Sequence, residues 1–188
     1  QHGPRGDPAH ADVAALVVGA AADQVGMQQD GAAARGQLAE HVAVHGSVLR
    51  PAELPGFIAE RSRRIVGLLT YQLIGDMLEI VTLNAIERRV GIGTLLIEAA
   101  ASTARHFRCR EVRLTTTNDN VDALRFYQRR GFRIAEVRPG AVDESRRTLK
   151  PHIPPTGEYG IPLTDEIELD QAPAAPGAVA PGSPPRTS

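Results

Sequence analysis

Short apolar runs separated by turn residues dominate the middle of the chain. They lie at Gly56 to Glu60, Arg64 to Leu73 and Met77 to Leu83, with the charged turn Arg61-Ser62-Arg63 and the pair Gly75-Asp76 between them. β-Branched runs of this length, bounded by turn residues, are typical of strands. The pattern therefore predicts three consecutive strands joined by tight connections.

A helical spacing replaces this pattern after the third run. Leu96, Ala100, Ala104 and Phe107 recur every three or four residues, which predicts a helix from Gly93 to Arg108. The two glycines in front of it, Gly91 and Gly93, free the main chain to turn and to approach a ligand closely.

A further strand and helix are predicted next. Glu111 to Thr117 is a β-rich run, and Val121 to Arg130 places Ala123, Phe126 and Tyr127 on one helical face. The cap-forming residues Asn118-Asp119-Asn120 precede this helix and Gly131 ends it. Strands at Phe132 to Val137 and Asp165 to Leu169 complete the predicted core.

The two ends are less regular. We expect residues 1–10 to be a disordered leader, Ala11 to Val25 to be an alanine-rich helix and Gly31 to Glu40 to be another, followed by a strand at His41 to Leu49. No first strand is predicted. Gln171 to Ser188 is rich in Pro, Ala, Gly and Ser, too poor in large apolar side chains to order itself.

Composition limits the organisation and the partners. With 188 residues, 42% of them hydrophobic, the chain suffices for one domain, expected at residues 11–170. A net charge of −1 gives no field that would attract nucleic acid or an anionic membrane. The single cysteine, Cys109, excludes an internal disulfide and fits a cytoplasmic protein. Arg108 and Arg110 beside it would lower the pKa of its thiol and so make it reactive, although an ordinary, unreactive thiol is the simpler interpretation.

The segment Arg88 to Thr94 joins a strand to a helix and predicts an anion site. The first N–H groups of a helix have no helical acceptor, and the helix dipole adds positive potential there. A P-loop would need Lys-Ser/Thr after Gly93, where the chain has Thr94-Leu95. A dinucleotide fingerprint would need a third glycine at Leu96, although Glu111 stands at about the distance of a ribose-binding acid. A turn that binds nothing is the third interpretation.

Two motifs in order resemble those of the GCN5-related N-acetyltransferase (GNAT) family. The first is Arg88-x-x-Gly91-x-Gly93, which resembles the pyrophosphate loop of that family. The second is Asn120-x-x-Ala123-x-x-x-Tyr127-x-x-x-Gly131-Phe132. The resemblance covers about residues 54–170, and the stretch after Arg138 is similar to one bacterial subgroup of the family.

The resemblance implies an α/β fold with a mostly antiparallel sheet, flanked by helices and splayed open between two parallel strands, the one that ends at Leu83 and the one that starts at Glu111. Acetyl-CoA would enter the gap as a cosubstrate. Its binding residues would be Val81 and Leu83 on the strand, Arg88, Arg89, Val90, Gly91, Ile92, Gly93 and Thr94 in the loop, and Asn120 and Tyr127 downstream.

Amine acetylation requires a proton acceptor and a proton donor. An amine of pKa about 10 is protonated at neutral pH and must lose a proton before it attacks a thioester. Glu79 would accept it directly or through water, unless this carboxylate merely faces solvent at a sheet edge. Leu83 N–H would stabilise the oxyanion. Tyr127 would donate to the leaving thiolate, unless it is only a core aromatic.

The other polar residues suggest little further chemistry. His41, His45, His106 and His152 lack ligand spacing, so no metal is expected. The charged run Asp143, Glu144, Arg146 and Arg147 is typical of a solvated helix face and, near an acceptor cleft, would select the charge of the acceptor. We expect an enzyme that is a monomer or homodimer and acetylates a small-molecule or peptide amine. The alternatives are a non-catalytic acyl-CoA-binding module and a dinucleotide-binding oxidoreductase.

Overall fold

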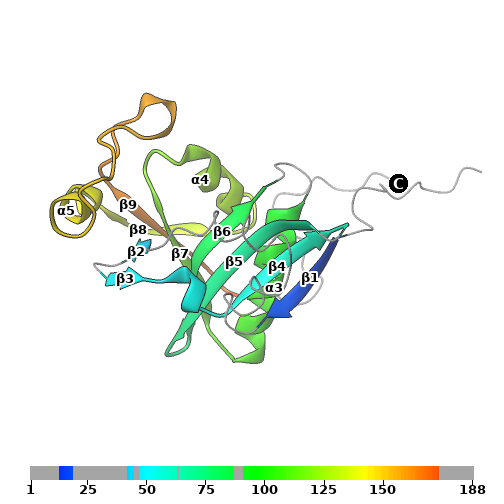
Figure 1. Ribbon diagram of the computed structural model, residues 1–188. Coiled ribbons are helices and arrows are strands. Elements are labelled where there is room, and N and C mark those ends of the chain that lie inside the picture. The colour runs from blue at the N-terminus through cyan, green and yellow to red at the C-terminus, as the bar shows by residue number, and fades with distance from the viewer. Residues whose placement is uncertain (1–12, 19–41, 45–46, 63, 87–90, 174–188) are drawn as a thin grey trace, which may run out of the picture. The chain divides into compact units, whose positions relative to one another are not determined.

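The computed structural model describes residues 13–18, 42–44, 47–62, 64–86 and 91–173 (Figure 1). They fall into two compact units. The first unit combines Gln1–His41, Arg50–Gln72 and Ile80–Thr103, and the second combines Val42–Leu49, Leu73–Glu79 and Ala104–Ser188. The predicted leader, the second N-terminal helix and nearly all of the predicted tail lie outside the described residues.

The first unit contains β1, β4, most of β5 and residues 80–85 of β6, strands that follow one another in the order β1-β4-β5-β6. Their bounds are Val13–Val18 for β1, Gly56–Arg61 for β4, Arg64–Ile74 for β5 and Met77–Ala85 for β6. β4 pairs antiparallel with β5, and residues 65–71 of β5 are all buried. A strand buried without alternation has both faces covered, which makes β5 the centre of this core. The three predicted strands are confirmed.

β1 corrects the sequence prediction at the N-terminus. Residues 13–18 were expected within a helix, and no first strand was expected, yet VAALVV forms a strand that pairs antiparallel with β4 from Val13↔Arg61 to Val18↔Gly56. Intrinsic helix propensity is a weak preference even for alanine, the best helix former, whereas a valine-rich segment gains a full ladder of backbone hydrogen bonds beside an existing strand. The tertiary partner therefore overrides local propensity.

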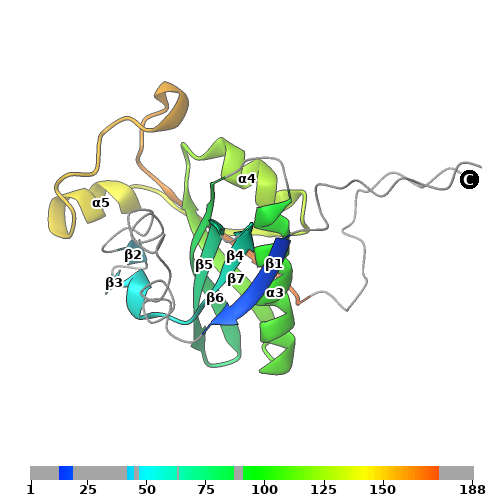
Figure 2. The same cartoon turned by 45° about the vertical axis from the view of Figure 1, so that its right-hand side comes forward.

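Helix α3 (Ile92–His106) packs against the face of these strands (Figure 2). Its buried side chains recur at helical spacing and include Ile92, Leu96, Ala100 and Ala104. A Cβ at Gly67 of β5 would lie 2.5 Å from Ile92 Cγ2 and 3.1 Å from Leu96 Cδ1. Strand and helix are therefore in contact at a distance that only glycine permits.

The second unit contains the strands in the order β7-β9-β8. They span Glu111–Thr117 (β7), Arg133–Arg138 (β8) and Glu166–Gln171 (β9), and β9 pairs antiparallel with both neighbours. The last strand thus inserts between two earlier ones, and it includes Gln171, which the sequence assigned to the tail. This unit also contains the helices α4 (Val121–Gln128) and α5 (Ala141–Thr148), the short turn η2 (Glu158–Gly160) and the hairpin of β2 (Val42–Val44) and β3 (Ser47–Leu49). A second short turn, η1 (Pro51–Glu53), belongs to the first unit.

One face of β7, β9 and β8 carries a ladder of charges. The antiparallel register aligns Thr117, Glu166 and Arg138 in one row across the strands and Arg113, Asp170 and Arg133 in another. The buried carboxylates Glu166 and Glu168 are each paired, the first with Arg138 and the second with Arg113 at 2.9 Å. Pairing compensates much of the cost of burying these charges.

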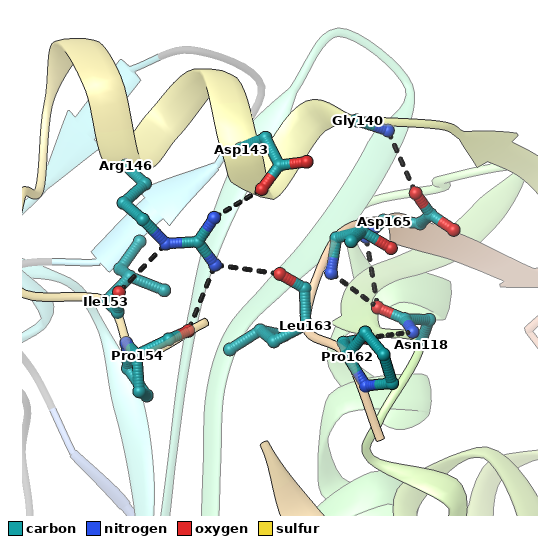
Figure 3. A network of polar contacts seen from close by, with 10 residues as sticks. Asn118, Gly140, Asp143, Arg146, Ile153, Pro154, Pro162, Leu163 and Asp165 are labelled. Carbon is teal, nitrogen blue, oxygen red and sulfur yellow. Dashed lines mark hydrogen bonds and ion pairs between the residues drawn. The ribbon is translucent and has the colours of Figure 1, made fainter. Parts of the chain in front are cut away.

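Arg146 fixes the segment that follows α5 (Figure 3). Its guanidinium pairs with Asp143 and donates to three carbonyl oxygens: those of Ile153 at 2.9 Å, Pro154 at 3.0 Å and Leu163 at 2.8 Å. The prediction of a solvated helix face is therefore wrong for Arg146, which binds backbone groups of the following segment. The neighbouring Arg147 is exposed. Five fixed guanidinium donors suit several carbonyls at once, as a lysine would not.

The thiol of Cys109 is not activated. It is buried, and burial together with the charge of Asp76 raises its pKa. Arg110, expected to lower this pKa, instead forms an ion pair with Asp76 at 2.9 Å. Among the described residues, none of the helices is long and apolar enough to span a membrane.

We expect Arg146→Gln to destabilise the protein by ~2 kcal/mol, because it leaves partly buried carbonyls without donors. Arg147→Gln, the exposed neighbour on the same helix, should change the free energy of unfolding by less than ~0.5 kcal/mol. Urea denaturation of both variants measures the difference. Equal effects would show that the Arg146 bonds contribute no more than an ordinary surface residue.

Candidate active site

The first turn of α3 provides a candidate anion site in the first unit. Gly91 has φ 84°, a left-handed conformation that strains any residue with a Cβ, and the chain enters the helix directly after it. Leu95 N–H donates to Gly91 O at 3.1 Å and so closes the first helical turn. The N–H groups of the turn itself precede any helical acceptor. Gly91, Ile92, Gly93 and Thr94 are described residues, whereas Arg88, Arg89 and Val90 lie outside them.

The end of β6 lies at the same point of the core. Ile86 N–H donates to Val66 O at 2.9 Å, and a Cβ at Gly67 would come within 3.3 Å of Asn84 O as well as touching α3. The predicted cofactor strand, with Val81 and Leu83 half-buried, therefore ends where α3 begins. A ligand bound along β6 would meet the helix N-terminus.

Glu79 of β6 is a buried carboxylate. It is 1% exposed, which rules out the interpretation that it faces solvent at a sheet edge. Further along β6, Thr82 shares a hydrogen bond of 2.8 Å with Thr70 of β5. A buried acid on a largely apolar strand is a feature of both structural ion pairs and catalytic sites.

Tyr127 on α4 lies in an aromatic cluster of the second unit. Its ring meets Phe126 at 5.2 Å and Phe132 at 5.6 Å, both edge to face. Burial raises the pKa of Tyr127 to about 12, against a smaller opposing effect of Arg130. The phenol is therefore protonated throughout the physiological range, as a hydrogen-bond donor requires. Tyr127 is also a core aromatic, and its role as a donor to the thiolate stays a prediction.

Of the three residues before α4 that the sequence predicts as helix caps, only Asn120 caps the helix. Asn120 caps the helix, since its Oδ1 accepts from Ala123 N–H at 3.2 Å. Asn118 and Asp119, also predicted as caps, bind residues 157–165 instead. Sequence reasoning missed these long-range partners because both residue types are equally typical of caps and turns. Glu111, the proposed ribose acid, accepts from Arg113 at 2.6 Å.

We also searched the part of the chain that the structure describes for side chains that could bind a metal ion. No group of three or more His, Cys, Asp or Glu side chains is placed there to hold an ion.

The chain belongs to the Acetyltransferase (GNAT) family, whose sequence model matches residues 28–132. This span includes the glycine loop and the motif from Asn120 to Phe132. The family consists of acetyltransferases, so the chain belongs among the acyltransferases.

The chain is also similar to other proteins in sequence and in fold. The uncharacterized protein YdhI of Bacillus subtilis (strain 168) is 43% identical over 127 residues, which cover 67% of this chain and 79% of that protein. The IAA acetyltransferase from Bacillus cereus ATCC 14579 superposes with a TM-score of 0.64 at 18% identity, covering 85% of this chain and 99% of the other. A GNAT family acetyltransferase from Elizabethkingia anophelis with acetyl-CoA bound superposes with a TM-score of 0.62 at 19% identity. The match covers 87% of this chain and 99% of the other. The predicted fold class is confirmed.

Burial of Tyr127 predicts a stability loss in strong alkali. The pKa is raised from 10.0 to about 12 on folding, so the contribution to stability is complete below pH 10 and is lost as the pH rises through about 12. Two pKa units correspond to ~2.7 kcal/mol at most. Between pH 9 and pH 11.5, the free energy of unfolding should fall less for Tyr127→Phe than for the wild type, as measured by denaturation at both pH values. Identical losses would place the phenol in contact with water.

Proposed function

We propose that the protein is an acetyl-CoA-dependent N-acetyltransferase that transfers the acetyl group to an amine by direct attack in a ternary complex. The observation that carries this proposal is the junction of β6 and α3, where the end of a strand leads into a helix N-terminus behind the left-handed Gly91. Backbone N–H groups and the helix dipole suit a pyrophosphate. Acetyl-CoA is bound in a solved relative of the same fold.

The cofactor contacts divide between main chain and side chains. N–H groups from Gly91 to Thr94 bind the pyrophosphate, and Arg88, Arg89 and Val90 belong to the same loop by sequence. The two arginines contribute charge-assisted bonds to phosphate oxygens. Backbone groups of Val81 and Leu83 pair with the pantetheine arm, and Asn120 and Tyr127 contribute from the second motif.

We assign the proton acceptor to Glu79 and the hydrogen-bond donor for the leaving group to Tyr127. Glu79, or a water that it holds, accepts the proton of the ammonium. Leu83 N–H stabilises the oxyanion. Tyr127 donates a hydrogen bond to the leaving sulfur, because full proton transfer from a phenol of pKa about 12 to a thiolate of ordinary pKa ~8.5 runs uphill by roughly 5 kcal/mol. Tyr127 therefore stabilises the thiolate while it leaves and keeps its own proton.

The acceptor is an amine of a metabolite, antibiotic, peptide or protein terminus, and the reaction takes place in the cytoplasm. The charge ladder of β7, β9 and β8 contains both signs, so its net charge does not indicate the charge of the acceptor. A monomer or a homodimer is compatible with this mechanism.

Acetyl-CoA should stabilise the protein by ~2.7 kcal/mol at 100 times its dissociation constant. Gly91→Ala should weaken this binding, because a Cβ at φ 84° strains the loop and moves its N–H groups. Gly140→Ala is the matched control, since Gly140 has φ 72° with open space around a Cβ and lies in the second unit. Titration calorimetry should show reduced affinity for the first variant and wild-type affinity for the second. Equal affinities in all three proteins would contradict the loop assignment.

Turnover separates the enzyme from its two alternatives. Amine panels with acetyl-CoA and a thiol-detecting reagent should reveal acceptor-dependent release of CoA. Tight binding of acetyl-CoA without release on any amine would identify a non-catalytic acyl-CoA-binding module. Binding of NADH in place of acetyl-CoA would identify a dinucleotide-binding protein.

A further inference from the structure

Residues 157–165, between α5 and β9, are fastened to the turn between β7 and α4. Asn118 Oδ1 accepts from Thr164 N–H at 3.1 Å and Asp165 N–H at 3.0 Å, and Asn118 Nδ2 donates to Pro162 O at 2.8 Å (Figure 3). One amide side chain therefore satisfies three backbone groups more than forty residues away in sequence. The bonds fix this part of the segment beside the start of α4.

Asp119 makes the second attachment and leaves no spare room. The residue is 6% exposed, and its carboxylate accepts from Glu158 N–H at 2.9 Å and from the Thr117 hydroxyl. A Cβ at Gly157 would lie 1.9 Å from Asp119 Oδ2 and 2.9 Å from Asp119 Cβ. Gly157 is therefore required by the carboxylate rather than by its own backbone conformation.

A third attachment reaches the first turn of α4. The hydroxyl of Tyr159 donates to Asp122 Oδ2 at 2.6 Å, although the residue is 69% exposed and has φ 56°. A non-glycine residue holds such a conformation only where its surroundings enforce it. The attachments at Asn118, Asp119 and Asp122 provide that enforcement.

α4 depends on such attachments because it is short. It has eight residues, and a helix of that length is not stable alone. Its C-terminal half is held by the contact of Tyr127 with Phe132. Its N-terminal end is held by the Asn120 cap and by the turn that carries Asn118 and Asp119.

We propose that Asp119 and Gly157 form a clasp that positions α4, and Tyr127 on it, for acetyl transfer. The clasp residues are positioning residues that act through the helix, and this inference rests on the proposed function. A displacement of about 1 Å of a catalytic group can reduce turnover by ~10²-fold. The segment after α5 therefore affects the rate without contributing a reacting group.

Asp119→Ala should lower kcat by ~10- to 100-fold, while the dissociation constant of acetyl-CoA changes by less than ~3-fold. Asp119→Asn should retain most activity, because its oxygen accepts from Glu158 N–H and the Thr117 hydroxyl reverses to accept from the amide. Gly157→Ala should resemble Asp119→Ala. Combining both substitutions should add no further loss, since the new methyl fills the space of the missing carboxylate.

Val142→Ala, in the buried core of α5, controls for general destabilisation and should keep the wild-type kcat. Amide hydrogen exchange gives a readout that needs no turnover: residues 124–128 of α4 should exchange faster in Asp119→Ala than in Asp119→Asn or Val142→Ala. Unchanged exchange in Asp119→Ala, or faster exchange with wild-type kcat, would overturn the clasp. A wild type that acetylates no amine would remove the proposed function alone, and exchange in α4 would still decide whether the clasp holds the helix.

Discussion

The close contact between β5 and α3 is the constraint on which the proposed cofactor site depends. Gly67 leaves no space for a methyl group between the strand and the buried side chains of Ile92 and Leu96. Because these two residues belong to the first turns of α3, core packing fixes the place where the helix begins. The same glycine adjoins Asn84 O at the end of β6. One point of the core thus positions both the end of β6 and the helix N-terminus that we assign to acetyl-CoA.

Helix α4 of the second unit depends on its surroundings in another way, because it is too short to be stable alone. Aromatic packing of Tyr127 against Phe132 secures one end, and side chains of the preceding turn secure the other. The same burial that holds Tyr127 raises its pKa to about 12. Packing and the role that we propose for Tyr127 are therefore linked at this residue, because a phenol that keeps its proton is able to donate a hydrogen bond to a leaving sulfur.

Local patterns predicted the elements of the core but not their long-range partners. The strands β4 to β7 and the helices α3 and α4 follow from hydrophobic spacing and glycine positions, and the two motifs indicated the family. β1 was missed because VAALVV is stabilised by β4, over 35 residues away, rather than by its own propensity. Arg146 and Asp119 were misjudged for the same reason, since the carbonyl and N–H groups that they bind belong to distant loops. Burial of Glu79 and Cys109 likewise depends on packing that a local window does not contain.

The most direct test of the account is amide hydrogen exchange in Gly91, Ile92, Gly93 and Thr94, measured by NMR with and without saturating CoA. If the first turn of α3 binds the pyrophosphate through its N–H groups, these amides should exchange at least ~10-fold more slowly in the complex, since a hydrogen-bonded donor must open before it exchanges. Ser102, exposed on the same helix, provides an internal reference. Saturation with CoA that leaves the exchange of all four amides unchanged would contradict the assignment of this turn as the cofactor site.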